Sequence, residues 1–260
     1  MKQFINTYWK TLLFFAAVGL IGGFLVGLSV LDSYPADIKQ LLYEELDASG
    51  LNQFPAELVV GVSTAIQSAA YGIVLGAVGI LLGKKTGLWK DERTFEKKPL
   101  VSAGAVALIG GIGIIVPDFV FFGKYSQAIM DSYAVKPTFT YIIGAVTYGG
   151  VIEEVMLRLF TMSLVAFIIH IFFRKKHEKP TTWMLVTANI ISALLFSAGH
   201  LPSTAVLLGI TPMIVFRCFL LNGTFGLLFG WLYRKYGLRY AMLAHGGCHV
   251  ISKLIWILFI

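Results

Sequence analysis

The run TFTYIIGAVTYGGVIEEVMLRLFTMSLVAFIIHIFF, residues 138–173, decides the fold of this chain. It is apolar over almost its whole length, but Glu153, Glu154 and Arg158 interrupt it near its centre. As one straight α-helix it would measure about 54 Å, whereas the hydrocarbon core of a bilayer is about 30 Å thick. We therefore predict a membrane-crossing helix that is tilted, kinked or extended beyond the bilayer and that carries ionisable side chains at membrane depth.

The rest of the chain has the same apolar character. Of its 260 residues 57% are hydrophobic and only 13% are charged, and its mean hydropathy is +0.78. A soluble domain carries about 25% charged residues, so lipid must replace water around much of this surface. Six further apolar runs are long enough to cross or enter a bilayer: 11–31, 59–83, 100–117, 183–199, 213–233 and 240–260. We predict an all-α, polytopic transmembrane helix bundle with about seven spans.

The loops between these runs alternate in charge. Residues 32–57 hold six acids and one base, whereas basic residues dominate 84–98, 174–182 and 234–239. The basic residues of the 84–98 loop are Lys84, Lys85, Lys90, Arg93, Lys97 and Lys98. Short basic loops face the cytoplasm in membrane proteins, which predicts a cytoplasmic N-terminus and a C-terminus on the other side. This arrangement also explains the net charge of +7, so we expect no nucleic-acid partner.

Glycine and cysteine have packing roles in this interpretation. Glycines four residues apart, at 23 and 27, 72 and 76, 79 and 83, and 226 and 230, predict close approach of helices. Cys218 and Cys248 both lie in apolar runs and form neither a disulfide framework nor a CxxC metal motif.

The glutamate pair in the fourth run is the first candidate site. We expect every other acid to lie in a loop or at a loop edge, and an ionisable group at membrane depth is usually functional. Arg158 follows Glu154 by four residues, which predicts an ion pair on one helix face. Glu153 is rotated by about 100° on an α-helix and should meet another helix. The simpler alternative is an ion pair that only locks helices together, but it leaves Glu153 without a partner.

Three histidines supply possible partners for Glu153. His200 ends the fifth run, and His245 and His249 share one helix face in the last run. A glutamate in an apolar setting can act as general base on a water, with histidines orienting that water or donating to an oxyanion. Alternatively, Glu153 and the three histidines are candidate ligands of a zinc ion that binds the water. The spacing leaves both mechanisms of hydrolysis open, and zinc is possible but not required.

These residues resemble the CPBP family, the CAAX-prenyl protease and bacteriocin-processing (Abi) group of intramembrane endopeptidases. The family motif EExxxR resembles Glu153 to Arg158, FxxxH resembles Phe196 to His200, and HxxxN resembles the segment that begins at His245. The resemblance covers about residues 135–255. It predicts a catalytic transmembrane core at 135–260, preceded by transmembrane helices without catalytic motifs at 1–134.

The resemblance also implies roles for single residues. Glu153 would activate the water, Glu154 and Arg158 would support it, His200 would share the water, and His245 with the residue four positions later would stabilise the oxyanion. That later residue is His249 where the family usually has asparagine, and a neutral imidazole can also donate one hydrogen bond. The arginine is followed by Leu159 instead of the usual glycine, which predicts different local packing.

The combined prediction is an integral protein of a bacterial plasma membrane that hydrolyses a peptide bond near or within the bilayer. Its partners would be membrane lipid and a peptide or protein substrate, which the family resemblance allows to be lipidated. A non-enzymatic peptide-binding relative and a proton-coupled transporter are the alternatives. His200 must also reach the depth of His245, and Pro202, Gly209 and Pro212 predict that a broken backbone over 200–212 brings it there.

Overall fold

The computed structural model, which describes residues 2–91 and 94–260, contains helices and no strands in this part of the chain. Seven helical segments are long and apolar enough to cross a membrane, as predicted. The first elements are α1 (Lys2–Val30), η1 (Leu31–Ser33), α2 (Ala36–Ala48), α3 (Ala56–Thr86), α4 (Lys97–Val120), η2 (Phe122–Lys124) and α5 (Gln127–Ser132). They are followed by α6 (Phe139–Thr147), η3 (Tyr148–Glu153), η4 (Val155–Met162), α7 (Ser163–Phe173), α8 (Thr182–Gly199), α9 (Leu201–Leu208), α10 (Pro212–Tyr236) and α11 (Leu238–Phe259).

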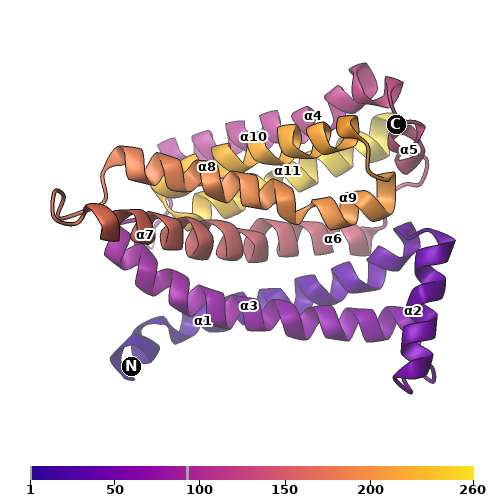
Figure 1. Cartoon of the computed structure of the whole chain (residues 1–260), viewed down its shortest axis with the longest axis horizontal. Coiled ribbons are helices and arrows are strands. Elements are labelled where there is room, and N and C mark those ends of the chain that lie inside the picture. Colours follow the sequence, from indigo (N-terminus) through magenta and orange to yellow (C-terminus); the bar gives the residue numbers. More distant parts are fainter. Residues whose placement is uncertain (1, 92–93) are drawn as a thin grey trace.

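The long helices run side by side along one axis (Figure 1). The turn between α7 and α8, the turn between α10 and α11 and the N-terminus lie at one end of this axis, and α2, α5 and the C-terminus lie at the other. The predicted basic loops therefore share one end of the molecule, except that Arg93 lies outside the described residues. At this end α3 stops at Gly87, whose φ of +75° ends the helix, and the lysines of the last turn suit the negative end of the helix dipole.

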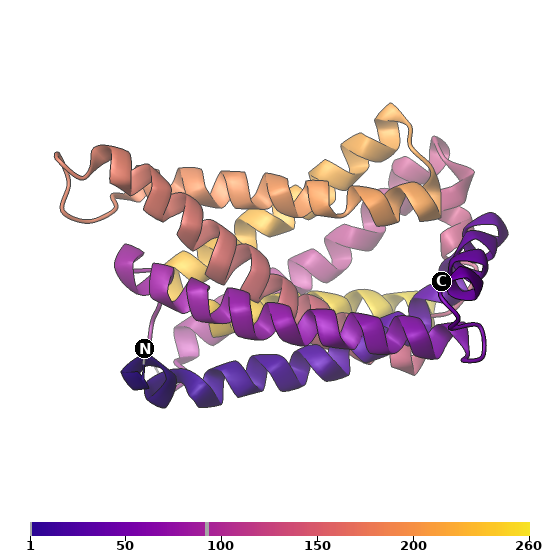
Figure 2. The same cartoon turned by 60° about the horizontal axis from the view of Figure 1, so that its bottom comes forward.

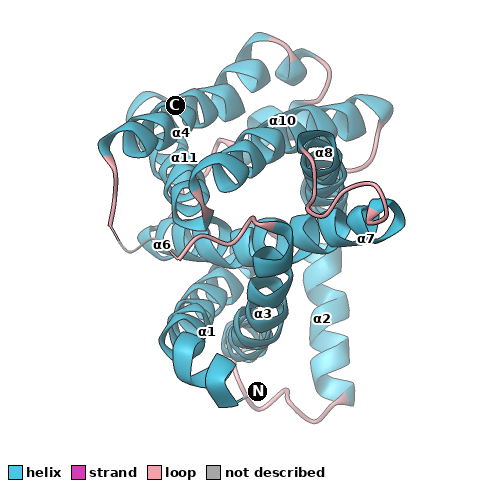
Figure 3. Ribbon diagram, turned by 90° about the vertical axis from the view of Figure 1, so that its left-hand side faces the viewer, coloured by secondary structure: helices cyan, strands magenta, loops and turns pink. Residues whose placement is uncertain are grey.

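When the bundle is viewed from the basic end, its centre is surrounded by α6, α7, α8, α10 and α11 (Figure 3). The helix α4 packs along the outer side of α11. The hairpin of α1 and α3 packs on the outer side of α6, η4 and α7, and it extends along the length of the molecule (Figure 2). The third predicted span thus packs with the C-terminal helices, and the first two form a separate hairpin.

Glycine allows the close helix contacts that the spacing predicts. A Cβ atom at Gly27 would lie 2.7 Å from the Gly61 Cα, so the backbones of α1 and α3 touch there. A Cβ at Gly79 would lie 2.7 Å from Leu159 Cγ, where α3 meets η4. The leucine that replaces the usual motif glycine is therefore accommodated by a glycine on the neighbouring helix.

One expectation about acidic residues is wrong. Asp118 belongs to α4 and is fully buried, because the helix continues to Val120 through Pro117 instead of ending there. Arg217 of α10 holds both carboxylate oxygens of Asp118, with Nε at 2.6 Å from Oδ1 and Nη2 at 2.5 Å from Oδ2. The Tyr133 hydroxyl also donates to this carboxylate at 2.8 Å. Burial, together with the negative charge of Asp118, raises the pKa of Tyr133 above its usual value, so the phenol remains a donor.

Candidate active site

The EExxxR motif lies on π-helical backbone, although the sequence predicted a plain α-helix. Both η3 and η4 have this wider winding, and Glu154 joins them. The Thr161 hydroxyl donates to the carbonyl of Met156, five residues earlier, at 2.7 Å. π-helical turns inside α-helices are rare and frequently occur at functional sites. Within η3, a Cβ atom at Gly150 would lie 2.9 Å from the Gly246 Cα, so the backbone of this wide turn lies against α11.

Arg158 binds Glu154 as the spacing predicted. Arg158 Nη1 lies 3.0 Å from Glu154 Oε1, and both side chains are inaccessible to solvent. Its Nη2 donates to the Gly226 carbonyl at 3.2 Å, so α10 also helps to hold the guanidinium. The guanidinium carbon lies 4.6 Å from the ring centroid of Phe196 and 5.4 Å from that of Phe229. Phe196, the first residue of FxxxH, therefore packs against the motif arginine.

Both glutamates face one histidine of α11. His245 Nδ1 lies 2.9 Å from Glu154 Oε1, and His245 Nε2 lies 3.8 Å from Glu153 Oε2. Glu153 meets another helix as predicted, but the contact of Glu154 with that same histidine was missed. Because a carboxylate accepts hydrogen bonds, the Nδ1–H donates to Glu154, and a neutral ring then presents an unprotonated Nε2 toward Glu153. Phe229 stacks on this ring at 4.5 Å and helps to fix its plane.

The two carboxylates differ in their exposure to solvent. The Glu154 side chain is completely buried, and its Oε1 meets both Arg158 and His245. The Glu153 side chain keeps 19% of its surface exposed. Glu153 is therefore the one that can meet a water or a substrate, while Glu154 is held by its partners.

His249 and His200 complete the motif residues around this pair. The His249 ring stacks on His245 with centroids 5.0 Å apart, and a Cβ at Gly149 would lie 2.5 Å from its Nε2, so the glycine makes room for it. His200 packs edge-on against Phe196 at 4.6 Å, and Phe196 lies 5.8 Å from His245.

The hydrogen bond of His200 fixes which nitrogen is free. Its Nδ1 lies 2.8 Å from the Phe196 carbonyl oxygen, which can only accept. Nδ1 therefore carries a proton, and in the neutral ring Nε2 remains as an acceptor.

The predicted broken backbone over 200–212 is wrong for most of its length. Residues Leu201–Leu208 form α9, with Pro202 in the first turn where a missing N–H is tolerated, and only three residues separate α9 from α10. The apolar segment Thr182–Leu208 continues as one candidate span. His200 thus lies well inside this span instead of at its end, which brings it toward the other motif residues without a buried loop.

The zinc alternative can be tested against the positions of the ligands. His200 and His245 each donate one ring N–H to a fixed acceptor, as metal-binding histidines commonly do. However, no three His, Cys, Asp or Glu side chains in the described part of the chain lie close enough together to hold a metal ion. The motif residues therefore do not form a complete ligand set for zinc.

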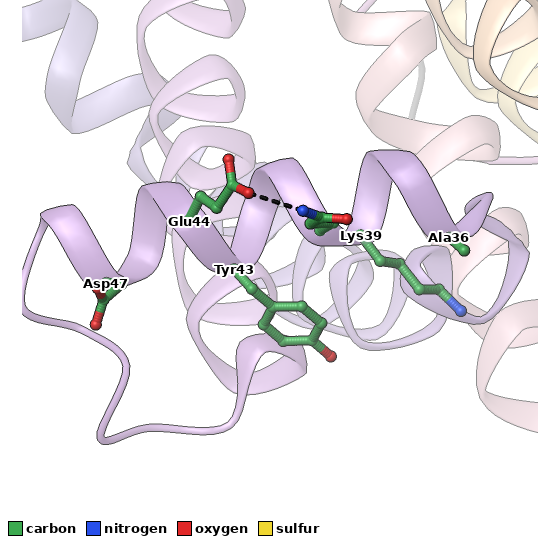
Figure 4. A pocket seen from close by; sticks show the side chains of 6 residues that line it. Ala36, Lys39, Tyr43, Glu44 and Asp47 are labelled. Carbon is green, nitrogen blue, oxygen red and sulfur yellow. Dashed lines mark hydrogen bonds between the residues drawn. The ribbon is translucent and has the colours of Figure 1, made fainter.

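A separate pocket lies on α2, away from the motif residues. It is a shallow surface lined by Ala36, Lys39, Gln40, Tyr43, Glu44 and Asp47, and Gln40 donates to Glu44 at 3.0 Å across it (Figure 4). It contains none of the predicted site residues.

Comparison with known proteins supports the interpretation of the motifs. No curated protein and no solved structure matches the chain. A family model matches residues 135–251, which contain all three motifs and the two π-helical segments. The family is described as type II CAAX prenyl endopeptidase Rce1-like, and the matched segment is similar to it.

Proposed function

We propose that the chain is an intramembrane endopeptidase in which Glu153 activates the attacking water. The observation that carries the proposal is the unequal pair of glutamates on His245: Glu154 is buried and held, whereas Glu153 is partly exposed beside a free ring nitrogen. A general base must reach its water directly, at about 3 Å, and among the two carboxylates only Glu153 has exposed surface.

The reaction follows from these positions. Glu153 takes one proton from water while the water oxygen attacks the peptide carbonyl carbon, forming a tetrahedral intermediate with a negative oxygen. The C–N bond then breaks, and the proton on Glu153 passes to the departing nitrogen. The products are a carboxylic acid and an amine, so one water is consumed for each bond cleaved.

The histidines assist the reaction without changing which atoms are consumed and formed. Neutral His200 accepts a hydrogen bond from the water through Nε2, and neutral His249 donates one N–H to the oxyanion. Glu154 fixes the tautomer of His245, and Arg158 holds the Glu154 carboxylate in place. Because His249 replaces an asparagine that would donate in the same way, the mechanism requires no metal at this position.

The substrate in this proposal is a peptide or protein segment at the membrane, in either lipidated or unlipidated form. In this proposal the N-terminus faces the cytoplasm, and the basic loops at the same end of the molecule support that orientation. A membrane peptide is thus cleaved within a helix bundle that lipid surrounds.

The test is cleavage of a panel of lipidated and unlipidated peptides by purified protein in liposomes. Glu153→Gln should abolish cleavage, because an amide cannot accept the proton, and Glu45→Gln on the exposed side of α2 should leave it unchanged. Metal content is measured on the same samples. Cleavage by Glu153→Gln at the wild-type rate, or peptide binding without cleavage by wild-type protein, would contradict the proposal, and the second result would identify a binding protein.

A further inference from the structure

Asn222 is a polar residue on the inner face of α10 that has no part in the proposed reaction. At about 100° per residue, it lies about 40° from Cys218 and about 40° from Gly226, and both of these are buried in the bundle. The exposed side chains of Phe216 and Leu220 lie about 120° and about 160° from it, on the face toward lipid. Asn222 is nevertheless only half-buried. Its exposed part therefore faces the inside of the bundle.

Two contacts of α10 relate Asn222 to the motif histidines. One turn before it, the Cys218 thiol donates at 3.3 Å to the α8 carbonyl three residues before His200. Two turns after it, Phe229 stacks on the ring of His245 at 4.5 Å. Along the axis of α10, Asn222 is about 6 Å from the first contact and about 10 Å from the second. It therefore lies at a depth between the contacts that α10 makes beside the two histidines.

The amide of Asn222 has a free acceptor. Its Nδ2 donates to the Cys218 carbonyl at 3.0 Å, and because a carbonyl can only accept, this contact fixes which end of the amide is the nitrogen. No donor in the described part of the chain forms a hydrogen bond with Oδ1. An amide oxygen in apolar surroundings costs free energy unless a donor meets it. Oδ1 can therefore accept a hydrogen bond from a ligand inside the bundle.

A peptide substrate brings donors that need such an acceptor. An extended segment forms no internal hydrogen bonds, so its N–H groups need acceptors from the protein where water is scarce. The described part of the bundle has no β-strand whose edge could pair with a peptide, and carbonyls inside a helix already accept from their own helix. Side-chain oxygens must therefore take this role.

We propose that Asn222 binds the substrate, with its Oδ1 accepting a hydrogen bond from a backbone N–H of the peptide. This inference rests on the proposed function. An extended peptide covers about 3.3 Å per residue, and about 10 Å along α10 separates Asn222 from the ring that stacks on His245. The N–H therefore belongs to a residue within about three positions of the bond to be cleaved. A hydrogen bond to the backbone is independent of the side chains of the substrate.

The test removes the backbone N–H groups of a cleaved peptide one at a time. In each member of a series, a single amide within three positions of the target bond is replaced by an ester, which lacks the N–H. The kcat/KM of each peptide is measured with wild-type protein and with Asn222→Leu, which keeps the approximate size of the side chain but removes the acceptor. We expect one ester to lower the wild-type kcat/KM by about tenfold, through KM, as for one lost hydrogen bond. In Asn222→Leu protein the same ester should cause no further loss.

A matched variant separates this role from a structural one. Thr224→Leu also replaces a polar side chain by leucine, on the exposed face of the same helix, and the esters should affect it as they affect wild-type protein. Thermal unfolding in detergent is measured for all variants. If Asn222→Leu does not fold, Asn222→Ala replaces it in the same series.

The inference is overturned if every ester has the same effect in Asn222→Leu as in wild-type protein, because a uniform loss of kcat/KM indicates a packing role. Failure of the proposed function is a different result, in which wild-type protein cleaves no peptide. The same series is then measured as peptide binding to Glu153→Gln protein, with and without Asn222→Leu. An ester effect that depends on Asn222 still supports the hydrogen bond there, and the absence of any such effect overturns it.

Discussion

Arg158 shows how a single buried charge can support a site that it does not enter. Its guanidinium meets the Glu154 carboxylate, the Gly226 carbonyl and the faces of Phe196 and Phe229. These contacts come from η4, α8 and α10, so one side chain connects three elements around His245. Loss of the charge would leave Glu154 ionised and buried beside one remaining partner.

We therefore predict that Arg158→Ala lowers the free energy of unfolding by about 3–5 kcal/mol, because it leaves an uncompensated buried carboxylate. The measurement is thermal or denaturant unfolding in detergent, with Arg174→Ala at the exposed end of α7 as the control. A variant with wild-type stability would show that the ion pair contributes little to the fold.

His249 permits a test of hydrogen-bond donation against metal binding. His249→Asn should keep much of the wild-type kcat, because the amide also donates, whereas His249→Ala should lose about 10²–10³-fold, as expected for the loss of one oxyanion donor. Peptide cleavage and bound metal are measured together. If His249→Asn loses both metal and activity, the histidine is a ligand and the metal-free mechanism is wrong.

At the scale of elements, the contact between α3 and η4 positions the motif backbone. A Cβ on Gly79 would lie 2.9 Å from the carbonyl carbon of Leu159, one residue after Arg158. The hairpin thus supports the π-helical segment directly through its backbone. Any side chain at Gly79 must push this segment away from α3.

We expect Gly79→Ala to lower stability by about 1–3 kcal/mol, as overpacking does, and to reduce kcat by displacing the glutamates. Gly104→Ala on α4 is the matched control, because its added methyl group would meet no atom within 4 Å. Unfolding in detergent and peptide cleavage are measured for both variants. Equal stability and equal kcat in the two variants would mean that α3 does not constrain η4.

The hydrophobic runs predicted the helices well, but not their details. Apolar runs of about 20 residues predict seven helical spans, because a backbone in lipid must form its hydrogen bonds internally. The π-helical winding was missed because one extra residue per turn leaves an apolar run equally apolar. Asp118 was assigned to a loop because Pro117 was taken as the end of a helix that in fact continues past it.

The candidate site was predicted in outline for similar reasons. The four-residue spacing predicted the Glu154–Arg158 pair, because that pair depends on one helix only. The bond from His245 to Glu154 depends on the orientation of α11 against η3 and η4, which no local pattern encodes. Arg217 could have been found as the one charged residue inside the run 213–233, and its partner Asp118 would then have been sought.

At the scale of the whole molecule, the charge of the loops determines the orientation of the bundle in the membrane. We predict that reporter fusions at Lys90 and Glu45 report opposite sides of the membrane, with Lys90 in the cytoplasm, because the basic loops share one end. Two reporters on the same side would contradict the arrangement of the first three spans. If the reporter at Glu45 were cytoplasmic and the one at Lys90 were outside, the fold would stand and its orientation in the membrane would be inverted.

The packing of α11 has a consequence for the order in which the site assembles during synthesis on the ribosome. The hairpin of α1 and α3 can close as soon as both are made, but α4 lies against α11, which is synthesised after every helix that surrounds it. His245 and His249 therefore enter the membrane after both glutamates, Arg158 and His200 are already there. A nascent chain that stalls before residue 245 therefore contains both glutamates and Arg158 but neither histidine of α11.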